Sequence, residues 1–137
     1  MFESQSVGAG FSGEVPPRSV LVVEDDGLIA LTLEDTVRDF GVHNVHVANT
    51  AELARRAADE GKFDCAILDV LIGQDETYDI ADRLALRNVP FLFCSAFTRD
   101  QLTERHRHRP WIGKPYRDED LLAWLTSLMG AVVPSPA

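Results

Sequence analysis

Apolar and polar positions alternate along this chain in blocks that predict strands and helices in turn. Five short, mostly apolar runs predict buried strands, and they cover residues 19–24, 45–47, 64–68, 90–94 and 111–113. Between most of these runs, apolar residues recur every three or four positions, which is the spacing of one helix face. The helices predicted in this way cover residues 26–40, 51–60, the region around 80–84, and 118–129. Regular alternation of the two patterns predicts a parallel sheet with crossover helices.

The stretch between the fourth and fifth strands has the weakest pattern. Residues 99–107 could form a further helix, but Leu102 is their only apolar residue. Because a segment with one apolar anchor opens at little cost, we expect residues 98–109 to be the least protected part of the domain. The run Arg105–Arg109 is the only dense basic run of the chain. Two interpretations stay open for it, a solvated loop or a patch that docks a partner.

Composition indicates a single folded domain. The 137 residues are 45% hydrophobic, and the formal charge of −9 argues against nucleic acid as a ligand. No apolar stretch is long enough to span a membrane. We expect a disordered arm rich in Gly, Ser and Pro at 1–18, the folded domain at 19–129 and a flexible tail at 130–137. Cys65 and Cys94 both fall in predicted strands, as expected for a cytoplasmic protein without disulfides.

Polar side chains stand at the ends of four of the predicted strands. Glu24 and Asp25 come at the end of the first strand, Asp69 follows the third, Ser95 the fourth and Lys114 the fifth. Because the carboxyl ends of parallel strands open onto one crevice, we expect these side chains to converge. Three neighbouring carboxylates repel one another unless a cation lies between them, and Mg²⁺ prefers carboxylate oxygen, water and phosphate. The arrangement predicts a divalent-metal and phosphoryl site.

Each of these features taken alone also has a simpler explanation. A lysine before a proline, as in Lys114-Pro115, is typical of a surface turn, and Ser95 could cap a helix or a turn. Acids such as Glu24 and Asp25 are common at the start of a helix. The position of Lys114, after the last strand and directly before the last helix, favours a functional role. There its ammonium would pair with a carboxylate when phosphate is absent and with phosphate when it is present.

Taken together, these residues resemble the receiver domain of two-component response regulators. The resemblance covers about residues 19–129 and rests on five elements in the family's order, with 45 positions from Glu24 to Asp69. It implies a doubly wound five-stranded parallel sheet of the flavodoxin type, in the order 2-1-3-4-5, within three α/β/α layers. It also implies that Asp69 is the phosphoacceptor, and that Glu24, Asp25, Asp69 and the backbone carbonyl of Leu71 hold Mg²⁺ or Mn²⁺.

The resemblance assigns roles to three further residues. Lys114 and Ser95 correspond to the lysine and hydroxyl that contact the transferred phosphoryl group, and Ser95 and Trp111 correspond to the pair that switches the output surface. Two features depart from many receivers. No Met-Pro follows Asp69, and the 19 positions from Ser95 to Lys114 are fewer than usual. The run Phe93–Phe97 loosely resembles the Phe-Ala-Thr-Gly-Tyr signature of a receiver subclass that is often linked to histidine kinases of the HWE type.

These assignments predict a single-domain response regulator that accepts a phosphoryl group from a histidine kinase on Asp69. It would signal through a partner protein, or act as a phosphate sink or shuttle, without binding nucleic acid or membrane. It would not be a conventional enzyme, although it would catalyse its own phosphorylation and dephosphorylation. One alternative is a degenerate receiver that acts as an interaction module. The other is a metal-dependent phosphatase with an aspartate nucleophile, but such enzymes need a second acid where this chain has Leu71.

Overall fold

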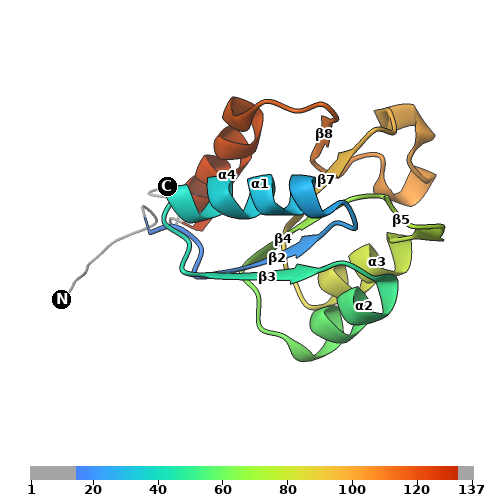
Figure 1. Cartoon of the computed structure of the whole chain (residues 1–137), viewed down its shortest axis with the longest axis horizontal. Helices are drawn as coiled ribbons and strands as arrows, with labels where there is room; N and C mark the ends of the chain where they lie inside the picture. Colours follow the sequence, from blue (N-terminus) through green and yellow to red (C-terminus); the bar gives the residue numbers. More distant parts are fainter. Residues whose placement is uncertain (1–14, 133–137) are drawn as a thin grey trace.

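Five parallel strands form one sheet at the centre of the computed structural model, which describes residues 15–132 (Figure 1). The strands are β2 (Ser19–Val23), β3 (Asn44–Ala48), β4 (Cys65–Leu68), β7 (Phe91–Ser95) and β8 (Trp111–Gly113). Their order across the sheet is β3-β2-β4-β7-β8. Counted along the chain, this is the order 2-1-3-4-5, so the predicted doubly wound sheet is confirmed.

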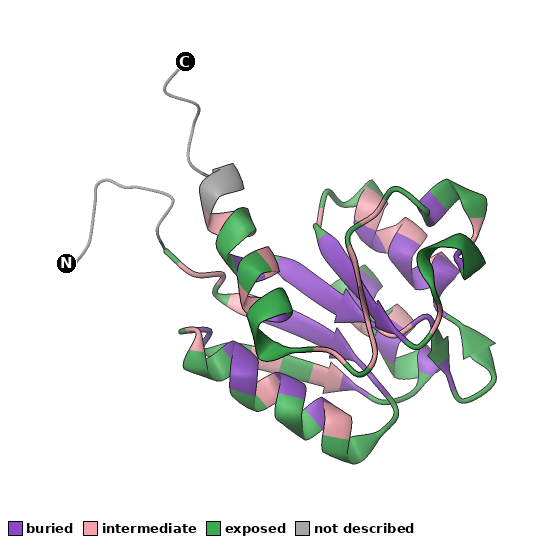
Figure 2. Ribbon diagram, turned by 90° about the horizontal axis from the view of Figure 1, so that it is seen from above, coloured by how far each residue is buried: buried purple, intermediate pink, exposed green. Residues whose placement is uncertain are grey.

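Helices cover both faces of the sheet because strand residues alternate between two separate cores. One core joins side chains of β2, β4 and β7 to those of α2 (Ala51–Glu60) and α3 (Tyr78–Leu86). The other joins the alternate positions of the same strands to α1 (Gly27–Asp39) and α4 (Asp118–Val132). The three central strands β2, β4 and β7 are therefore buried on both faces, which is typical of parallel sheets, whereas the edge strands β3 and β8 are partly exposed (Figure 2).

The helices begin and end close to the predicted positions. The carboxylate of Asp26 accepts hydrogen bonds from two backbone amides of the first turn of α1, and the hydroxyl of Thr50 accepts one at the start of α2. Gly41, with φ of +115°, follows α1 in the left-handed conformation that glycine favours. The apolar stripe of α1 faces the core at Leu33 and Val37, which are fully buried.

The structure corrects the prediction for the segment between β7 and β8. Residues 99–107 form no α-helix but two single turns of 3₁₀-helix, η2 (Arg99–Gln101) and η3 (Glu104–His106). Arginine side chains hold these turns by donating to backbone carbonyls, with Arg99 reaching the oxygens of Arg107 and Arg109 at 2.6 and 2.8 Å. The segment is also not simply a solvated loop, because the side chain of His106 is only 2% exposed.

Two further differences concern short stretches of backbone. A two-stranded antiparallel hairpin, β5 (Leu71–Ile72) and β6 (Asp75–Glu76), follows the third strand of the sheet, and the sequence did not indicate it. α4 continues to Val132, so the first residues of the predicted flexible tail are helical.

Part of the predicted N-terminal arm is fixed against the domain. The backbone amides of Arg18 and Ser19 both donate to one carboxylate oxygen of Asp64, at 2.7 and 3.2 Å. The rest of the predicted arm, residues 1–14, and the end of the predicted tail, residues 133–137, lie outside the described residues. Within residues 15–132, none of the helices has both the length and the apolar character that a membrane crossing requires.

Candidate functional site

Residues at the ends of three different strands meet at the carboxyl edge of the sheet. Glu24 follows β2, Asp69 follows β4 and Lys114 follows β8. The ammonium nitrogen Nζ of Lys114 donates to Oε1 of Glu24 at 2.6 Å and to Oδ2 of Asp69 at 2.7 Å. The peptide bond between Lys114 and Pro115 is cis. One lysine therefore links two carboxylates that lie 45 positions apart in sequence.

Asp25 completes an acidic cluster beside this lysine. One carboxylate oxygen from each of Glu24, Asp25 and Asp69 lies within 4.8 Å of the others. Glu24 is buried, Asp69 is partly buried and Asp25 is exposed, so the cluster opens to solvent on the side of Asp25. Three carboxylates beside a single ammonium leave an excess of negative charge. This donor set fits a hard divalent cation such as Mg²⁺, which binds carboxylate oxygens and keeps several of its waters.

Burial and the ion pairs act in opposite directions on these groups. Burial raises the pKa of Glu24, and the hydrogen bond from Lys114 only partly offsets this effect. Burial by itself would lower the pKa of Lys114, but its hydrogen bonds to Asp69 and Glu24 outweigh this effect and raise it. Lys114 is therefore charged at neutral pH, and Glu24 takes up a proton more readily than a solvated glutamate.

Backbone amides orient all three carboxylates. The amide of Gly73 donates to Oδ2 of Asp25 at 2.7 Å, and the amide of Asp26 donates to Oε2 of Glu24 at 3.1 Å. A longer contact of 3.4 Å joins the amide of Leu71 to Oδ1 of Asp69. Leu71 and Gly73 belong to the β5–β6 hairpin, so this unpredicted element borders the site. Gly73, in the turn of the hairpin, has a φ of +60°, which glycine adopts readily.

The structure joins Ser95 to the backbone of Lys114 and, through Phe97, to Trp111. Ser95 is buried at the end of β7, and its backbone carbonyl accepts a hydrogen bond from the amide of Lys114 at 2.9 Å. Its hydroxyl oxygen accepts a hydrogen bond from the amide of Phe97 at 3.1 Å. The indole nitrogen of Trp111 donates to the carbonyl of Phe97 at 2.9 Å. Phe97 therefore connects the two residues that the resemblance assigns to the switch.

An apolar groove lies next to the site. It has a volume of about 490 Å³ and is lined by Leu28, Ile29, Thr32, Lys114, Pro115, Tyr116 and Asp118. On the adjoining surface of α1, Leu28 and Leu31 are 74% and 54% exposed. The hydroxyl oxygen of Tyr116 is buried, and burial raises the pKa of this phenol to about 12. The groove joins the lysine of the site to a surface that an apolar partner can cover.

Comparison with known proteins gives a consistent result. A family model for the response regulator receiver domain matches residues 20–126. Transcriptional regulatory protein PdtaR of Mycobacterium tuberculosis is 31% identical over 110 residues, which cover 77% of this chain and 54% of that protein. Phyllosphere-induced regulator PhyR of Methylorubrum extorquens is 31% identical over 114 residues, which cover 80% of this chain and 43% of that protein. The chain thus spans about half the length of these curated relatives.

Solved structures agree with these matches. The solution structure of SdrG from Sphingomonas melonis Fr1 superposes with a TM-score of 0.73 at 32% identity, covering 87% of this chain and 99% of that one. The receiver domain of PhyR from Erythrobacter litoralis superposes with a TM-score of 0.74 at 25% identity, covering 89% and 97%.

Proposed function

We propose a phosphoacceptor function for this chain, which belongs to the response regulator receiver domain family. A carboxylate oxygen of Asp69 attacks the phosphorus atom of a phosphohistidine on a histidine kinase. The N–P bond breaks, the electron pair returns to the imidazole, and Asp69 becomes an acyl phosphate. The chain catalyses this transfer and the later hydrolysis on itself, without turning over an external substrate.

The observation that carries this proposal is the double ion pair of Lys114. Its ammonium lies 2.7 Å from Oδ2 of Asp69, so it is already beside any phosphoryl group that the aspartate receives. Among residues 15–132, the other oxygen, Oδ1, has only the long contact with the Leu71 amide at 3.4 Å. We therefore assign the attack to Oδ1, while Lys114 fixes the carboxylate through Oδ2. The ammonium stabilises negative charge on the transferring group without moving far.

The remaining residues of the site serve the same transfer. Glu24, Asp25, Asp69 and the carbonyl of Leu71 would hold Mg²⁺ or Mn²⁺, which supplies positive charge for the phosphoryl oxygens. Among the described residues, the hydroxyl of Ser95 accepts a hydrogen bond from the Phe97 amide and donates none, so its proton can be donated to a phosphoryl oxygen. Ser95 and Trp111 then pass the change to the surface around Phe97.

The partner that donates the phosphoryl group is a histidine kinase, and we place its docking surface on α1. Leu28 and Leu31 are the exposed apolar residues there, next to the groove that leads to Lys114. An apolar helix face of the kinase would cover them and bring its phosphohistidine to the open side of the cluster. The likeness of Phe93–Phe97 to the subclass signature supports a kinase of the HWE type. The receiving protein then acts on a downstream partner, or serves as a phosphate sink or shuttle.

Phosphotransfer from purified, radiolabelled histidine kinases tests this function. Wild type should take label within the first time points from its cognate kinase, and Asp69→Asn should take none. Leu31→Asp should slow transfer from the kinase but leave phosphorylation by acetyl phosphate unchanged, because the small donor does not use α1. Labelling of Asp69→Asn at the wild-type level would refute the acceptor assignment. Equal effects of Leu31→Asp with both donors would refute the docking surface.

A further inference from the structure

Thr77 holds the backbone of the phosphoacceptor. The residue is fully buried, between the β5–β6 hairpin and the first residue of α3. Its hydroxyl donates to the backbone carbonyl of Asp69 at 2.6 Å and lies 3.3 Å from that of Val70. Its amide donates to the same carbonyl of Val70 at 2.9 Å. Two consecutive carbonyls, one of them on Asp69, therefore depend on this single residue.

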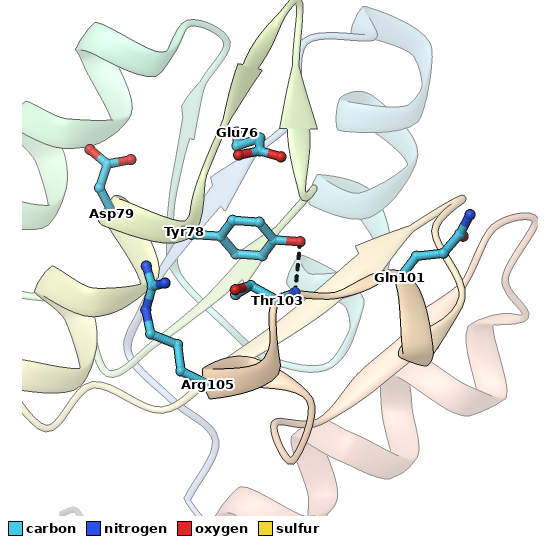
Figure 3. A pocket seen from close by; sticks show the side chains of 6 residues that line it. All are labelled: Glu76, Tyr78, Asp79, Gln101, Thr103 and Arg105. Atoms are coloured by element: carbon cyan, nitrogen blue, oxygen red, sulfur yellow. Dashed lines mark hydrogen bonds between the residues drawn. The ribbon is translucent and has the colours of Figure 1, made fainter.

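The next residue, Tyr78, holds the segment that replaces a helix between β7 and β8. Its phenol oxygen accepts a hydrogen bond from the amide of Thr103 at 3.2 Å, drawn as a dashed line in Figure 3. Its ring stacks on His106 with centroids 5.9 Å apart and an angle of 10° between the planes. His106 is itself held by Asp82 of α3, through a contact of 2.8 Å from Nε2.

Figure 3 shows Tyr78 between α3 and this segment. A hollow of about 450 Å³ lies there, lined by Glu76, Tyr78, Asp79, Gln101, Thr103 and Arg105. This hollow separates part of the segment from the start of α3, whereas Leu102 of the segment packs into the core. Residues 98–109 have two buried side chains of their own, Leu102 and His106. Beside these side chains and the contacts with Asp82, Tyr78 joins the segment to the first residue of α3, which directly follows Thr77.

We propose that Thr77 is a positioning residue for Asp69 and that Tyr78 transmits the state of Asp69 to residues 98–109. This inference rests on the proposed phosphoacceptor function. Thr77 and Tyr78 are consecutive residues. The hydroxyl of Thr77 is bonded to the carbonyl of Asp69, and the phenol of Tyr78 is bonded to the amide of Thr103. A change in the backbone at Asp69 therefore moves the start of α3, and with it the acceptor of the Thr103 amide. This path is separate from the one through Ser95, Phe97 and Trp111.

Thr77→Val and Thr77→Ser form the matched test of the positioning role. Valine has a similar shape but cannot donate, which leaves the carbonyl of Asp69 buried without its partner. Serine keeps the donor. With acetyl phosphate and Mg²⁺, Thr77→Val should be phosphorylated about tenfold more slowly or worse, because a misplaced nucleophile loses rate steeply. Thr77→Ser should stay close to wild type. Melting curves establish that each variant is folded at the assay temperature.

Tyr78→Phe tests the link to the segment, since it removes only the acceptor of the Thr103 amide. We expect this variant to be phosphorylated at nearly the wild-type rate. In wild type and in Thr77→Ser, phosphorylation should change hydrogen exchange at residues 99–106, and in Tyr78→Phe this change should be lost. The positioning role would be overturned if Thr77→Val is phosphorylated at the wild-type rate. It would also be overturned if Thr77→Ser is phosphorylated as slowly as Thr77→Val. A full exchange response in Tyr78→Phe would overturn the link.

Failure of the proposed function would give a different result. If wild type takes up no phosphoryl group from any donor, the function is wrong, and the link is then tested without phosphate. Thr77→Val should still speed hydrogen exchange at the Thr103 amide, whereas Thr77→Ser should not. Equal hydrogen exchange at the Thr103 amide in the two variants would overturn the inference. If Thr77→Ser is poorly folded, Thr77→Val is compared with wild type instead, and equal exchange in these two proteins would overturn it.

Discussion

Removing the ammonium of Lys114 should destabilise the protein in a way that depends on pH and metal. Lys114→Met keeps most of the aliphatic side chain but leaves Glu24 and Asp69 facing each other. The side chains of Lys114, Glu24 and Asp69 are 16%, 2% and 13% exposed. Breaking a fully buried ion pair costs about 3–5 kcal/mol. Because Lys114 and Asp69 keep some contact with water and Glu24 can take up a proton, we expect a loss of about 2–3 kcal/mol at neutral pH.

The pH dependence of this loss follows from the direction of the shifts. The pKa of Lys114 is raised in the folded state, so its contribution is complete below its unfolded value and is lost only as the pH rises through the folded value. In the variant, the pKa of Glu24 rises further above 4.5, the usual value of a solvated glutamate, because the hydrogen bond and charge of Lys114 that lower it are gone. The variant therefore loses stability as the pH rises above 4.5. Its free energy of unfolding should lie only slightly below that of wild type near pH 4.5 and further below it at neutral pH.

Urea unfolding in EDTA, followed by tryptophan fluorescence, measures this deficit at several pH values. Glu24→Gln in the Lys114→Met background is the matched control, and it should recover part of the lost stability because it removes the like-charge repulsion. Added Mg²⁺ should also reduce the deficit, since a cation replaces the missing positive charge. A free energy of unfolding within about 0.5 kcal/mol of wild type at neutral pH, or a deficit that does not shrink on acidification, would refute the reasoning.

Three further predictions concern the metal, the acyl phosphate and the buried histidine. Mg²⁺ at ten times its Kd should add about 1.4 kcal/mol and raise the melting temperature by a few degrees, and Asp25→Ala should remove this effect. The acyl phosphate should be long-lived because Leu71 and Phe97 offer no polar group to orient water. Because Phe97 packs against the core, Leu71→Asn should speed decay of the isolated phosphoprotein more than Phe97→Glu does. Equal decay of wild type and both variants would contradict this. Burial lowers the pKa of His106 below 6.5, so its neutral form stabilises the fold and this contribution is lost as the pH falls below that value. Wild type should therefore lose more stability than His106→Phe in that range, as measured by urea unfolding.

The sheet and most of the site could be predicted because both follow from periodic patterns. Strands such as Cys65–Leu68 are apolar on both faces, and the polar residue that ends each strand must lie at one edge of the sheet. This is why Glu24, Asp69 and Lys114 were expected to converge, and the structure brings them into contact. The bounds of α2 and β8 agree with the prediction for the same reason.

The missed features depend on contacts that leave no period in the sequence. Two kinds of contact hold the segment between β7 and β8. The guanidinium of Arg99 donates to the backbone carbonyl of Arg107, and the ring of His106 contacts the carboxylate of Asp82, 24 positions away. Such contacts replace the apolar stripe that a helix would need. The strands of the β5–β6 hairpin have two residues each, too few to show alternation. No sequence pattern marks Thr77, because burial of its hydroxyl depends on the path of the backbone around it.

The most direct test of the account is to identify the residue that carries the phosphoryl group. Wild type is phosphorylated with acetyl phosphate and Mg²⁺, the acyl phosphate is reduced with borohydride, and the peptides are sequenced by mass spectrometry. Reduction converts a phosphorylated aspartate to homoserine, so the product should appear at position 69 and should be absent from Asp69→Asn and from wild type treated without phosphate donor. Homoserine at Asp25 or at another acid, or none under conditions in which intact protein gains a phosphoryl group, would contradict the central claim.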